Sequence, residues 1–343
     1  MRVLAGDIGG TKTAVAIVQI GARRLSLERS RTYPSARHTC LEEILEDFLG
    51  QEPRRPRYAG FGVAGPVIAG RSSITKLPWV VDERTVSRTL GIPRVRVAND
   101  FVAAALGIPY LTGRQVVTVS EGEVERGGPM ALIGAGTGLG QAALWKSGGK
   151  VEVLPSEGGH ADFGPRTPRE DRLVRFVRAR FGRVSRDRLL SGEGMGHVYD
   201  FLKEDGAAPE SARIAHAFEK EDRAAVIGRL GLEGNDPLCA LALATFASIY
   251  GSEAGNLALQ YRATGGVYVG GGIAARILPA LRTPAFLDAF RSKPPMEDLL
   301  ARIPVRIVRD PRLGLFGAAA AAYRMAIETT RPSSTSTRRE IRG

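Results

Sequence analysis

Cysteine is nearly absent from this chain of 343 residues, which holds only Cys40 and Cys239, in unrelated sequence contexts. Two such residues form no disulfide framework, so the sequence fits a reducing compartment. With only four histidines and no Cys/His cluster, the chain also lacks the ligand pattern of a structural zinc site. We therefore expect a cytoplasmic protein without structural disulfides or zinc.

Long apolar runs are missing as well. No run approaches the roughly 20 residues that a membrane-spanning helix needs. The N-terminus enters a strand-like run without the charged region and cleavage site of a signal peptide. We expect no membrane association, and the length and 43% hydrophobic residues are typical of a globular protein with two ordinary domains.

Charge is unbalanced, with a formal net charge of +12. One interpretation is attraction to nucleic acid or to anionic metabolites. The alternative is scattered surface charge, since arginines are spread along the whole chain and no aromatic-plus-basic motif of an RNA-binding protein occurs. We expect no specific nucleic-acid partner.

Glycine is plentiful and gathers in three turns, each directly after an apolar, strand-like run. The first lies in VLAGDIGGTKTAVAIV (3–18), the second in ALIGAGTGLGQAALW (131–145), and the third is Gly270–Gly272 after the run 267–269. Glycine tolerates positive φ and lets a ligand approach the backbone, and successive N–H groups in a tight turn form a concavity for phosphate oxygens. The pattern predicts a two-lobed, phosphate-handling enzyme.

The standard nucleotide fingerprints do not occur. The chain has no G-x-x-x-x-G-K-[ST], and the second turn reads G-A-G-T-G-L-G over residues 134–140 rather than G-x-G-x-x-G. Neither a P-loop nor a dinucleotide-binding turn is therefore supported.

Polar side chains accompany the first two turns. Asp7, at the mouth of the first turn, is suited to a hydrated Mg²⁺, because this ion prefers carboxylates, waters and substrate phosphates. The alternative is an aspartate that stabilises its own turn. Thr11 and Thr137 lie inside the two turns, where a hydroxyl either donates to phosphate or forms an ordinary turn bond.

Asn99 and Asp100 lie between a short apolar strand (95–98) and an alanine-rich helix (101–106). At such a junction Asn or Asp serves as an N-cap. The functional interpretation makes Asp100 a general base and Asn99 a substrate ligand, since an aspartate with an ordinary pKa near ~3.9 is ionised at neutral pH and accepts a hydroxyl proton.

Glu157, His160 and Asp162 form a compact polar set in SEGGHADF. A metal site would need further ligands nearby. Hydrogen bonding to vicinal hydroxyls suits this set better, and the alternative is a solvated polar loop.

The remaining pattern alternates strands and helices. We expect strands at 3–6, 13–20, 25–33, 58–63, 151–154 and 305–308, and helices at 41–48, 82–90, 169–181, 238–261 and 315–326. We expect a glycine-bearing turn at 189–196, a helical excursion on the surface at 204–236, and burial of the helix 238–261, which has few charges. The tail from 329, rich in Ser, Thr and Arg, is expected to be disordered.

The chain resembles the bacterial glucokinase family, in the branch without the zinc-binding cysteine signature of the repressor/open-reading-frame/kinase (ROK) group. The matching segments, in order, are GDIGGTKT (6–13), VAGP (63–66), VANDFVAAALGIP (97–109), GAGTGLG (134–140), PSEGGHADF (155–163), RLLSGEG (188–194) and GGVYVGGGI (265–273). The resemblance implies an α/β protein with a two-lobed, actin-like, hexokinase-type fold. Each lobe would have a ribonuclease H-like core, with a cleft between the two. The small lobe would span 1–110 and be completed by a C-terminal helix at about 309–328, the large lobe would span 111–308, and 329–343 would be the tail.

The same resemblance implies an ATP-dependent, Mg²⁺-assisted glucokinase, which phosphorylates the 6-hydroxyl of glucose in the first step of glycolysis. It makes Asp100 the base and a substrate ligand. The other sugar ligands would be Asn99, Glu157, His160 and Asp187. The nucleotide residues would be Asp7, Gly9, Gly10, Thr11, Gly136, Thr137, Gly138, Gly271 and Gly272, with Asp7 reaching Mg²⁺ through water.

One position departs from the family pattern: Asp187 stands where the family commonly has glutamate. The shorter acid would make a weaker or water-bridged contact with the sugar. This affects the expected affinity for the hexose and the selectivity among epimers. Separately, the alternatives are a kinase for mannose, fructose or N-acetylglucosamine, and a non-catalytic sugar sensor or regulator of the same fold. The sequence also leaves open whether the protein forms a homodimer.

Overall fold

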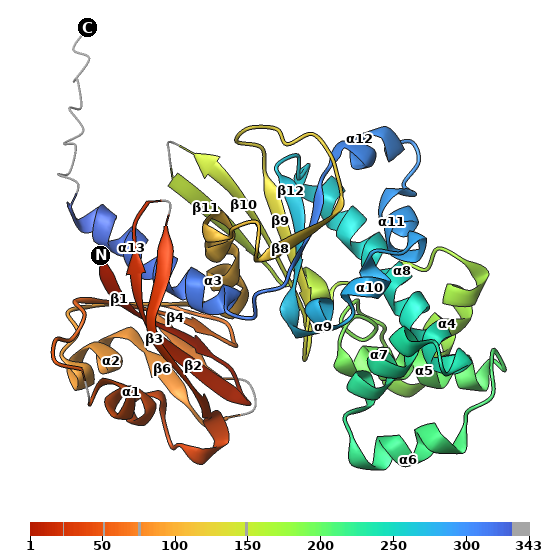
Figure 1. Cartoon of the computed structure of the whole chain (residues 1–343), viewed down its shortest axis with the longest axis horizontal. Helices are drawn as coiled ribbons and strands as arrows, with labels where there is room; N and C mark the ends of the chain where they lie inside the picture. The colour runs from red at the N-terminus through yellow and green to blue at the C-terminus, as the bar shows by residue number, and fades with distance from the viewer. Residues whose placement is uncertain (23, 51, 75–76, 148–149, 331–343) are drawn as a thin grey trace, which may run out of the picture. The chain divides into compact units, whose positions relative to one another are not determined.

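The computed structural model describes residues 1–343 except 23, 51, 75–76, 148–149 and 331–343 (Figure 1). The chain divides into two compact units. Unit 1 is Met1–Tyr110 with residues 314–330, and unit 2 is Leu111–Leu313. The last helix, α13 (Leu313–Thr330), thus belongs almost wholly to unit 1. It includes Thr329, where we expected the tail to begin, and residues 331–343 lie outside the described part of the chain.

Unit 1 is built on a five-stranded sheet of order β3-β2-β1-β4-β7. Its strands are β1 (Arg2–Ile8), β2 (Lys12–Ile20), β3 (Leu25–Pro34), β4 (Tyr58–Val63) and β7 (Arg94–Asn99). The first three form an antiparallel meander, and β4 and β7 run parallel to β1. The meander and the strand 58–63 were predicted from their apolar runs and are confirmed.

Helices cover both faces of this sheet. The further elements of unit 1 are η1 (Ser35–Arg37), α1 (Leu41–Leu49), β5 (Arg71–Ser73), β6 (Val80–Asp82), α2 (Glu83–Leu90), α3 (Asp100–Gly107), η2 (Ile108–Tyr110) and α13. Apolar side chains of α1 and α2 share one core with the sheet residues Ala59 and Phe61 of β4. Gly60 points to the other face, because neighbouring residues of a strand alternate. There a Cβ would lie 2.0 Å from the Ala318 carbonyl oxygen, so α13 packs directly on β4.

Unit 2 repeats the same strand arrangement. Its six-stranded sheet has the order β11-β10-β9-β12-β13-β8. The strands are β8 (Val116–Ser120), β9 (Met130–Ala135), β10 (Leu139–Ser147), β11 (Lys150–Ser156), β12 (Gly266–Gly270) and β13 (Val305–Val308). As β1 does in unit 1, β9 pairs antiparallel with the next strand of the chain and parallel with a strand on its other side. The two similar glycine turns of the sequence therefore occupy equivalent places in two similar sheets.

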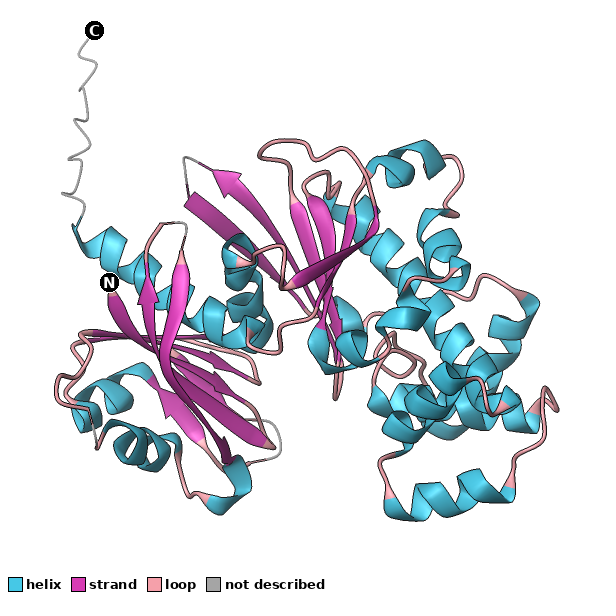
Figure 2. Cartoon of the chain, in the orientation of Figure 1, coloured by secondary structure: helices cyan, strands magenta, loops and turns pink. Residues whose placement is uncertain are grey.

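The helices of unit 2 gather on one side of its sheet (Figure 2). They are η3 (Gly158–His160), α4 (Pro168–Phe181), α5 (Gly192–Glu204), α6 (Ala212–Lys220), α7 (Arg223–Glu233), α8 (Pro237–Tyr261), α9 (Gly271–Arg276), α10 (Leu278–Leu281), α11 (Pro284–Arg291) and α12 (Glu297–Arg302). The prediction for 189–196 was wrong, because α5 begins there. Ser191 caps the helix by accepting the Gly194 N–H at 3.0 Å. The excursion 204–236 is helical as predicted, but α7 buries Val226, Ile227 and Leu230 in the core.

Helix α8 is the central helix of unit 2. It is long and apolar enough, by length and composition, to cross a membrane, although the sequence showed no continuous apolar run of that length. However, 72% of its most apolar window is buried inside the protein. The expected burial of 238–261 is thus confirmed, and we interpret α8 as a core helix.

Candidate active site

The first glycine turn, between β1 and β2, contains the predicted nucleotide residues Gly9, Gly10 and Thr11. The Gly9 N–H donates to the Lys12 carbonyl oxygen at 3.0 Å, which closes the turn. Ser35, fully buried in η1, holds it from the side: its hydroxyl donates to the Gly9 carbonyl at 2.8 Å and its N–H donates to the Thr11 carbonyl at 3.1 Å. Sequence reasoning missed Ser35, since nothing in its local sequence marks it as part of this turn.

Asp7 lies at the end of β1 and is half-buried. Its pKa is raised to about 6, first by burial and then by the negative charge of Asp100, while Lys12 acts in the opposite direction. The carboxylate also lies against the first turn of α13, since a Cβ on Gly314 would come within 2.5 Å of its Oδ2. Unit 1 therefore brings Asp7 and Asp100 close enough to interact electrostatically.

The raised pKa predicts the pH dependence of stability. Because the folded protein holds a proton on Asp7 more tightly than the unfolded chain, the contribution of Asp7 to stability is fully present below its unfolded pKa near 3.8 and is lost as the pH rises through about 6. Asp7→Asn removes the buried charge, so at pH 8 we expect about 3 kcal/mol more stability than in the unmutated protein. The gain should shrink toward pH 4. Thermal unfolding in metal-free, nucleotide-free buffer across this range checks it, and a gain that stays constant with pH would contradict it.

Asn99 and Asp100 begin α3. The Asn99 Oδ1 accepts the N–H groups of Phe101 at 2.9 Å and Val102 at 3.2 Å, and its Nδ2 donates to the Gly65 carbonyl at 3.2 Å. The N-cap interpretation of Asn99 is therefore confirmed. Asp100 is half-buried at the first helical position, where its Oδ1 accepts the Phe101 N–H at 2.8 Å. Both side chains are held in fixed orientations by the helix start.

In unit 2, the predicted sugar residues come together after β11. Glu157 precedes η3 and is exposed, and His160 ends it with 68% of its side chain exposed. The His160 Nδ1 lies 3.6 Å from Oδ2 of Asp187, whose N–H donates to the Gly159 carbonyl at 2.9 Å. The hydroxyl of Ser185 donates to Asp187 Oδ1. The structure thus groups Glu157, His160 and Asp187, which lie as much as 30 residues apart in the sequence.

Asp162 does not join this group. Its Oδ1 accepts from Arg183 Nε at 2.6 Å, in an exposed ion pair. The Arg183 guanidinium also donates to the His160 carbonyl at 2.8 Å. Asp162 and Arg183 therefore tie the loop after η3 to the segment before Asp187.

The second and third glycine turns also come together, at the ends of two neighbouring parallel strands. Gly134 of β9 lies opposite Gly270 of β12. Gly136, Thr137 and Gly138 form the turn after β9, and Gly271 and Gly272 open α9 directly after β12. Gly271 has φ +83°, and a Cβ there would lie 2.4 Å from the Ala135 carbonyl, so glycine is required.

The outer faces of these two turns are open. A Cβ added to Gly136, Gly138 or Gly272 would meet no atom of the described chain within 4 Å. The Gly136 N–H closes its own turn by donating to the Gly138 carbonyl at 2.8 Å, and the other backbone N–H groups of such open turns are accessible to a phosphate group. The geometry of unit 2 therefore fits a nucleotide at this edge of its sheet.

Tyr250 of α8 connects these two strand ends from beneath. Its hydroxyl accepts the Ala135 N–H at 2.9 Å and donates to the Gly270 carbonyl at 3.3 Å. The side chain is fully buried, and burial raises the pKa of the hydroxyl. Tyr250 thus supports both turns of unit 2, and sequence reasoning missed it because it lies 115 residues from Ala135.

Comparison with known proteins identifies the family. The glucokinase family model matches residues 4–325. A curated glucokinase from Nostoc sp. is 39% identical over 94% of this chain and 99% of its own length, and one from Synechocystis sp. is 37% identical over 94% and 98%. The chain belongs to the glucokinase family.

Solved structures agree on the fold. A glucokinase from an Antarctic psychrotroph is similar at a TM-score of 0.83, with 30% identity, over 94% of this chain and 99% of that one. A ROK family glucokinase from Streptomyces griseus, in complex with glucose and AMPPNP, is similar at a TM-score of 0.64 with 21% identity, over 94% of this chain and 100% of that one. The fold is the two-lobed, actin-like fold of sugar kinases, as the sequence predicted.

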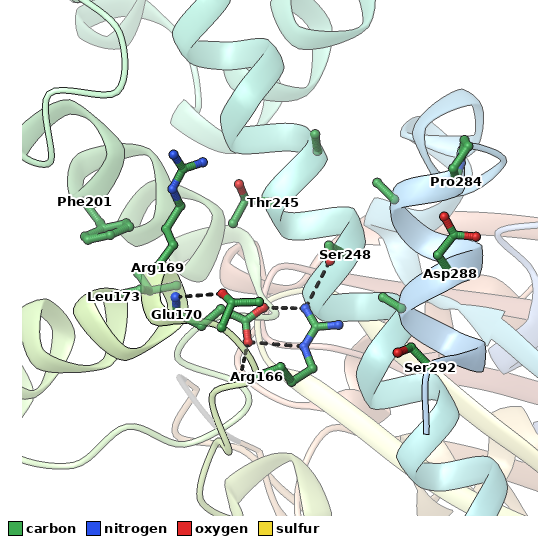
Figure 3. Close-up of a pocket in the computed structure, with 14 residues that line it drawn as sticks. Arg166, Arg169, Glu170, Leu173, Phe201, Thr245, Ser248, Pro284, Asp288 and Ser292 are labelled. Carbon is green, nitrogen blue, oxygen red and sulfur yellow. Dashed lines mark hydrogen bonds and ion pairs between the residues drawn. The ribbon is translucent and has the colours of Figure 1, made fainter. Parts of the chain in front are cut away.

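A cavity of about 470 Å³ in unit 2 lies apart from the residues that the family resemblance selects (Figure 3). It is lined by α4, α5, α8, α11 and the residues before α4, and none of its lining residues is a predicted site residue. Arg166 already pairs with Glu170 and donates to Ser248 Oγ at 3.0 Å. Because this guanidinium is already bonded to protein side chains, we do not propose the cavity as the active site.

Proposed function

We propose that the protein transfers the γ-phosphoryl group of ATP to the 6-hydroxyl of glucose, the first step of glycolysis. Membership of the glucokinase family supports this reaction. The single structural observation that carries it is the approach of Asp187 to His160, with Glu157 at the start of the same short helix η3. Such a set is suited to the hydroxyls of a sugar.

Asp100 is the proposed general base. Its carboxylate accepts the proton of the 6-hydroxyl as the oxygen attacks phosphorus, while the Phe101 N–H keeps Oδ1 oriented. Asn99 is proposed to contact the same sugar through its remaining donor capacity, since its Oδ1 caps α3. Glu157, His160 and Asp187 are proposed to bind the other hydroxyls, with Asp187 also orienting His160.

The glycine turns are proposed to hold the nucleotide. Gly9, Gly10 and Thr11, with Gly136, Thr137 and Gly138, would form the two phosphate turns. The N–H groups of Gly9 and Gly136 close these turns on the Lys12 and Gly138 carbonyls, so the proposed phosphate donors are the other backbone N–H groups and the two threonine hydroxyls. Gly271 and Gly272 would lie beside the adenosine, where the open space above Gly272 leaves room for it. Positioning and charge stabilisation of this kind supply most of the catalysis in phosphoryl transfer.

Mg²⁺ is proposed to bind at Asp7, through water. The residues fit this ion: Asp7 and Asp100 place two carboxylates within electrostatic reach of each other, a repulsion that a cation relieves. No group of three or more potential metal-ligating side chains occurs among the described residues, in keeping with an ion held mainly by water and phosphate. Bound there, Mg²⁺ would neutralise phosphate charge.

The test is a coupled assay that measures ADP release with glucose, mannose, fructose and N-acetylglucosamine, and with ATP, ADP or polyphosphate as donor. We expect the highest kcat/KM with glucose and ATP. If kcat/KM were tenfold higher with another hexose, that hexose and not glucose would be the substrate. If the protein bound sugar without turnover, it would be a sensor and not an enzyme.

We also propose that the protein is cytoplasmic and has no membrane or specific nucleic-acid partner. We further propose that it forms a homodimer, which analytical ultracentrifugation would check.

A further inference from the structure

A buried ion pair lies beneath the sugar residues of unit 2. The Glu253 carboxylate of α8 is 5% exposed, and its Oε1 is 2.7 Å from the guanidinium of Arg186, whose side chain is 16% exposed. Oε1 also accepts from Gln141 Nε2 at 2.8 Å, and Oε2 accepts from Asn256 Nδ2 at 3.0 Å. Glu253 is therefore the centre of a polar network that joins α8, β10 and the segment 183–187.

The partners of Glu253 touch the sugar loop directly. Arg186 donates from its guanidinium to the Gly158 carbonyl at 3.4 Å and from its backbone N–H to the Ala161 carbonyl at 3.0 Å. Gln141 lies against Gly158, where a Cβ would come within 2.2 Å of the amide oxygen Oε1. Since Glu157 precedes Gly158 and Asp187 follows Arg186, each contact is one residue away from a proposed sugar ligand.

Stability alone does not account for this network. Burying two charges costs desolvation energy that their attraction barely repays, and well-packed apolar residues commonly do as well. A buried pair does, however, fix the relative positions of the segments that carry it, because leaving either charge unpaired is costly. In this protein those segments carry the sugar ligands of unit 2.

We propose that Glu253 is a positioning residue for the sugar. By holding Arg186 and Gln141, Glu253 fixes the distance of Gly158 from β10. It also fixes the distance between the side chains of Asp187 and His160. The proposal rests on the proposed function, because it assumes that the loop 157–160 binds the phosphoryl acceptor. Glu253 itself does not touch the reacting atoms.

Tyr250 provides the matched control, one turn earlier on the same buried helix. Its hydroxyl supports the two nucleotide turns rather than the sugar loop. Tyr250→Phe and Glu253→Gln each remove one buried polar function of α8 with little change of volume. A general loosening of α8 would raise the KM for glucose and the KM for ATP in both variants. A positioning role would instead raise the KM for glucose in one variant and the KM for ATP in the other.

The experiment compares steady-state kinetics of the full-length variants with varied glucose and varied ATP. For Glu253→Gln we expect the KM for glucose to rise about tenfold or more, with the KM for ATP within about twofold of the unmutated value. For Tyr250→Phe we expect the KM for ATP to rise and the KM for glucose to stay within about twofold of the unmutated value. A Glu253→Gln variant that raises both KM values equally, or that leaves the KM for glucose unchanged, overturns the proposal.

The double variant Glu253→Gln/Arg186→Gln separates positioning from stability. It removes both buried charges, so its Tm should recover relative to Glu253→Gln, while its KM for glucose stays raised. If the KM recovers together with the Tm, Glu253 has only a structural role. The double variant also tests the proposal if Glu253→Gln alone folds poorly. Failure of the proposed function itself would appear separately, as an unmutated protein that does not phosphorylate glucose.

Discussion

Asp100→Asn should reduce kcat for glucose phosphorylation by at least ~10²-fold, because the amide cannot accept the proton of the 6-hydroxyl. The substitution keeps the shape of the side chain, and the amide oxygen still accepts the Phe101 N–H that Asp100 Oδ1 accepts at 2.8 Å. We therefore expect the KM for glucose to change little. The Tm should stay the same or rise, because the substitution also removes the negative charge that raises the pKa of Asp7. Steady-state rates with the coupled ADP assay, together with thermal unfolding, measure both effects.

Asp82→Asn is the control for this substitution. Asp82 is also an aspartate of unit 1 at a helix start, where its Oδ1 accepts the Thr85 N–H at 2.8 Å to cap α2. Asn and Asp are nearly equivalent as N-caps, so neither stability nor rate should change appreciably. If Asp100→Asn kept more than a tenth of kcat, Asp100 would be a capping residue and another group would have to be the base.

Gly159→Ala should disrupt the sugar site more than any other single methyl group in the loop. The added Cβ would lie 2.0 Å from the carbonyl oxygen of Leu139, a backbone atom of β10. Leu139 is paired with Ala135 of β9, and β10 pairs with β11 from Gln141 onward, so this backbone is held more firmly than the loop. The loop must therefore move outward, carrying Glu157 and His160 with it. A displacement of about 1 Å is enough to lower kcat/KM for glucose about 10²-fold.

Gly164→Ala, only five residues further on, is the matched control. A Cβ there meets no described atom within 4 Å, and the backbone does not have positive φ. Its kcat/KM should stay within about twofold of the unmutated value, and the KM for ATP should be unaffected in both variants. Equal activity of Gly159→Ala and Gly164→Ala would mean that the loop does not bind the sugar in the arrangement described here.

Several features could be predicted from the sequence because they depend on neighbouring residues. The apolar runs around the first two glycine turns predicted strands, and the lack of charge along 238–261 predicted a buried helix; both are confirmed. The N-cap alternative for Asn99 also followed from its place between a strand and a helix. In contrast, the glycines of 189–196 suggested a turn, yet Ser191 caps a helix there and packing against α8 outweighs their low helix propensity.

The supports of the site could not be predicted. Ser35, Tyr250 and Glu253 each bond to a segment that is distant in the sequence, and Gln141 lies 112 residues from its partner Glu253. From a single sequence, a serine or glutamate that is buried cannot be distinguished from one that is exposed. The same holds for Asp162, whose place among polar neighbours suggested a sugar ligand but whose carboxylate binds Arg183.

The sequence by itself determined where the glycine turns lie, which strands flank them and which family the chain resembles, since local backbone preferences and ordered motifs carry that information. Only the tertiary structure decided how these turns are held. It placed Gly134 opposite Gly270, set Asp187 3.6 Å from His160, and put a charged pair under the loop between them. The physical reason is that a buried polar group must find a partner, and packing of the whole unit determines which partner lies within reach.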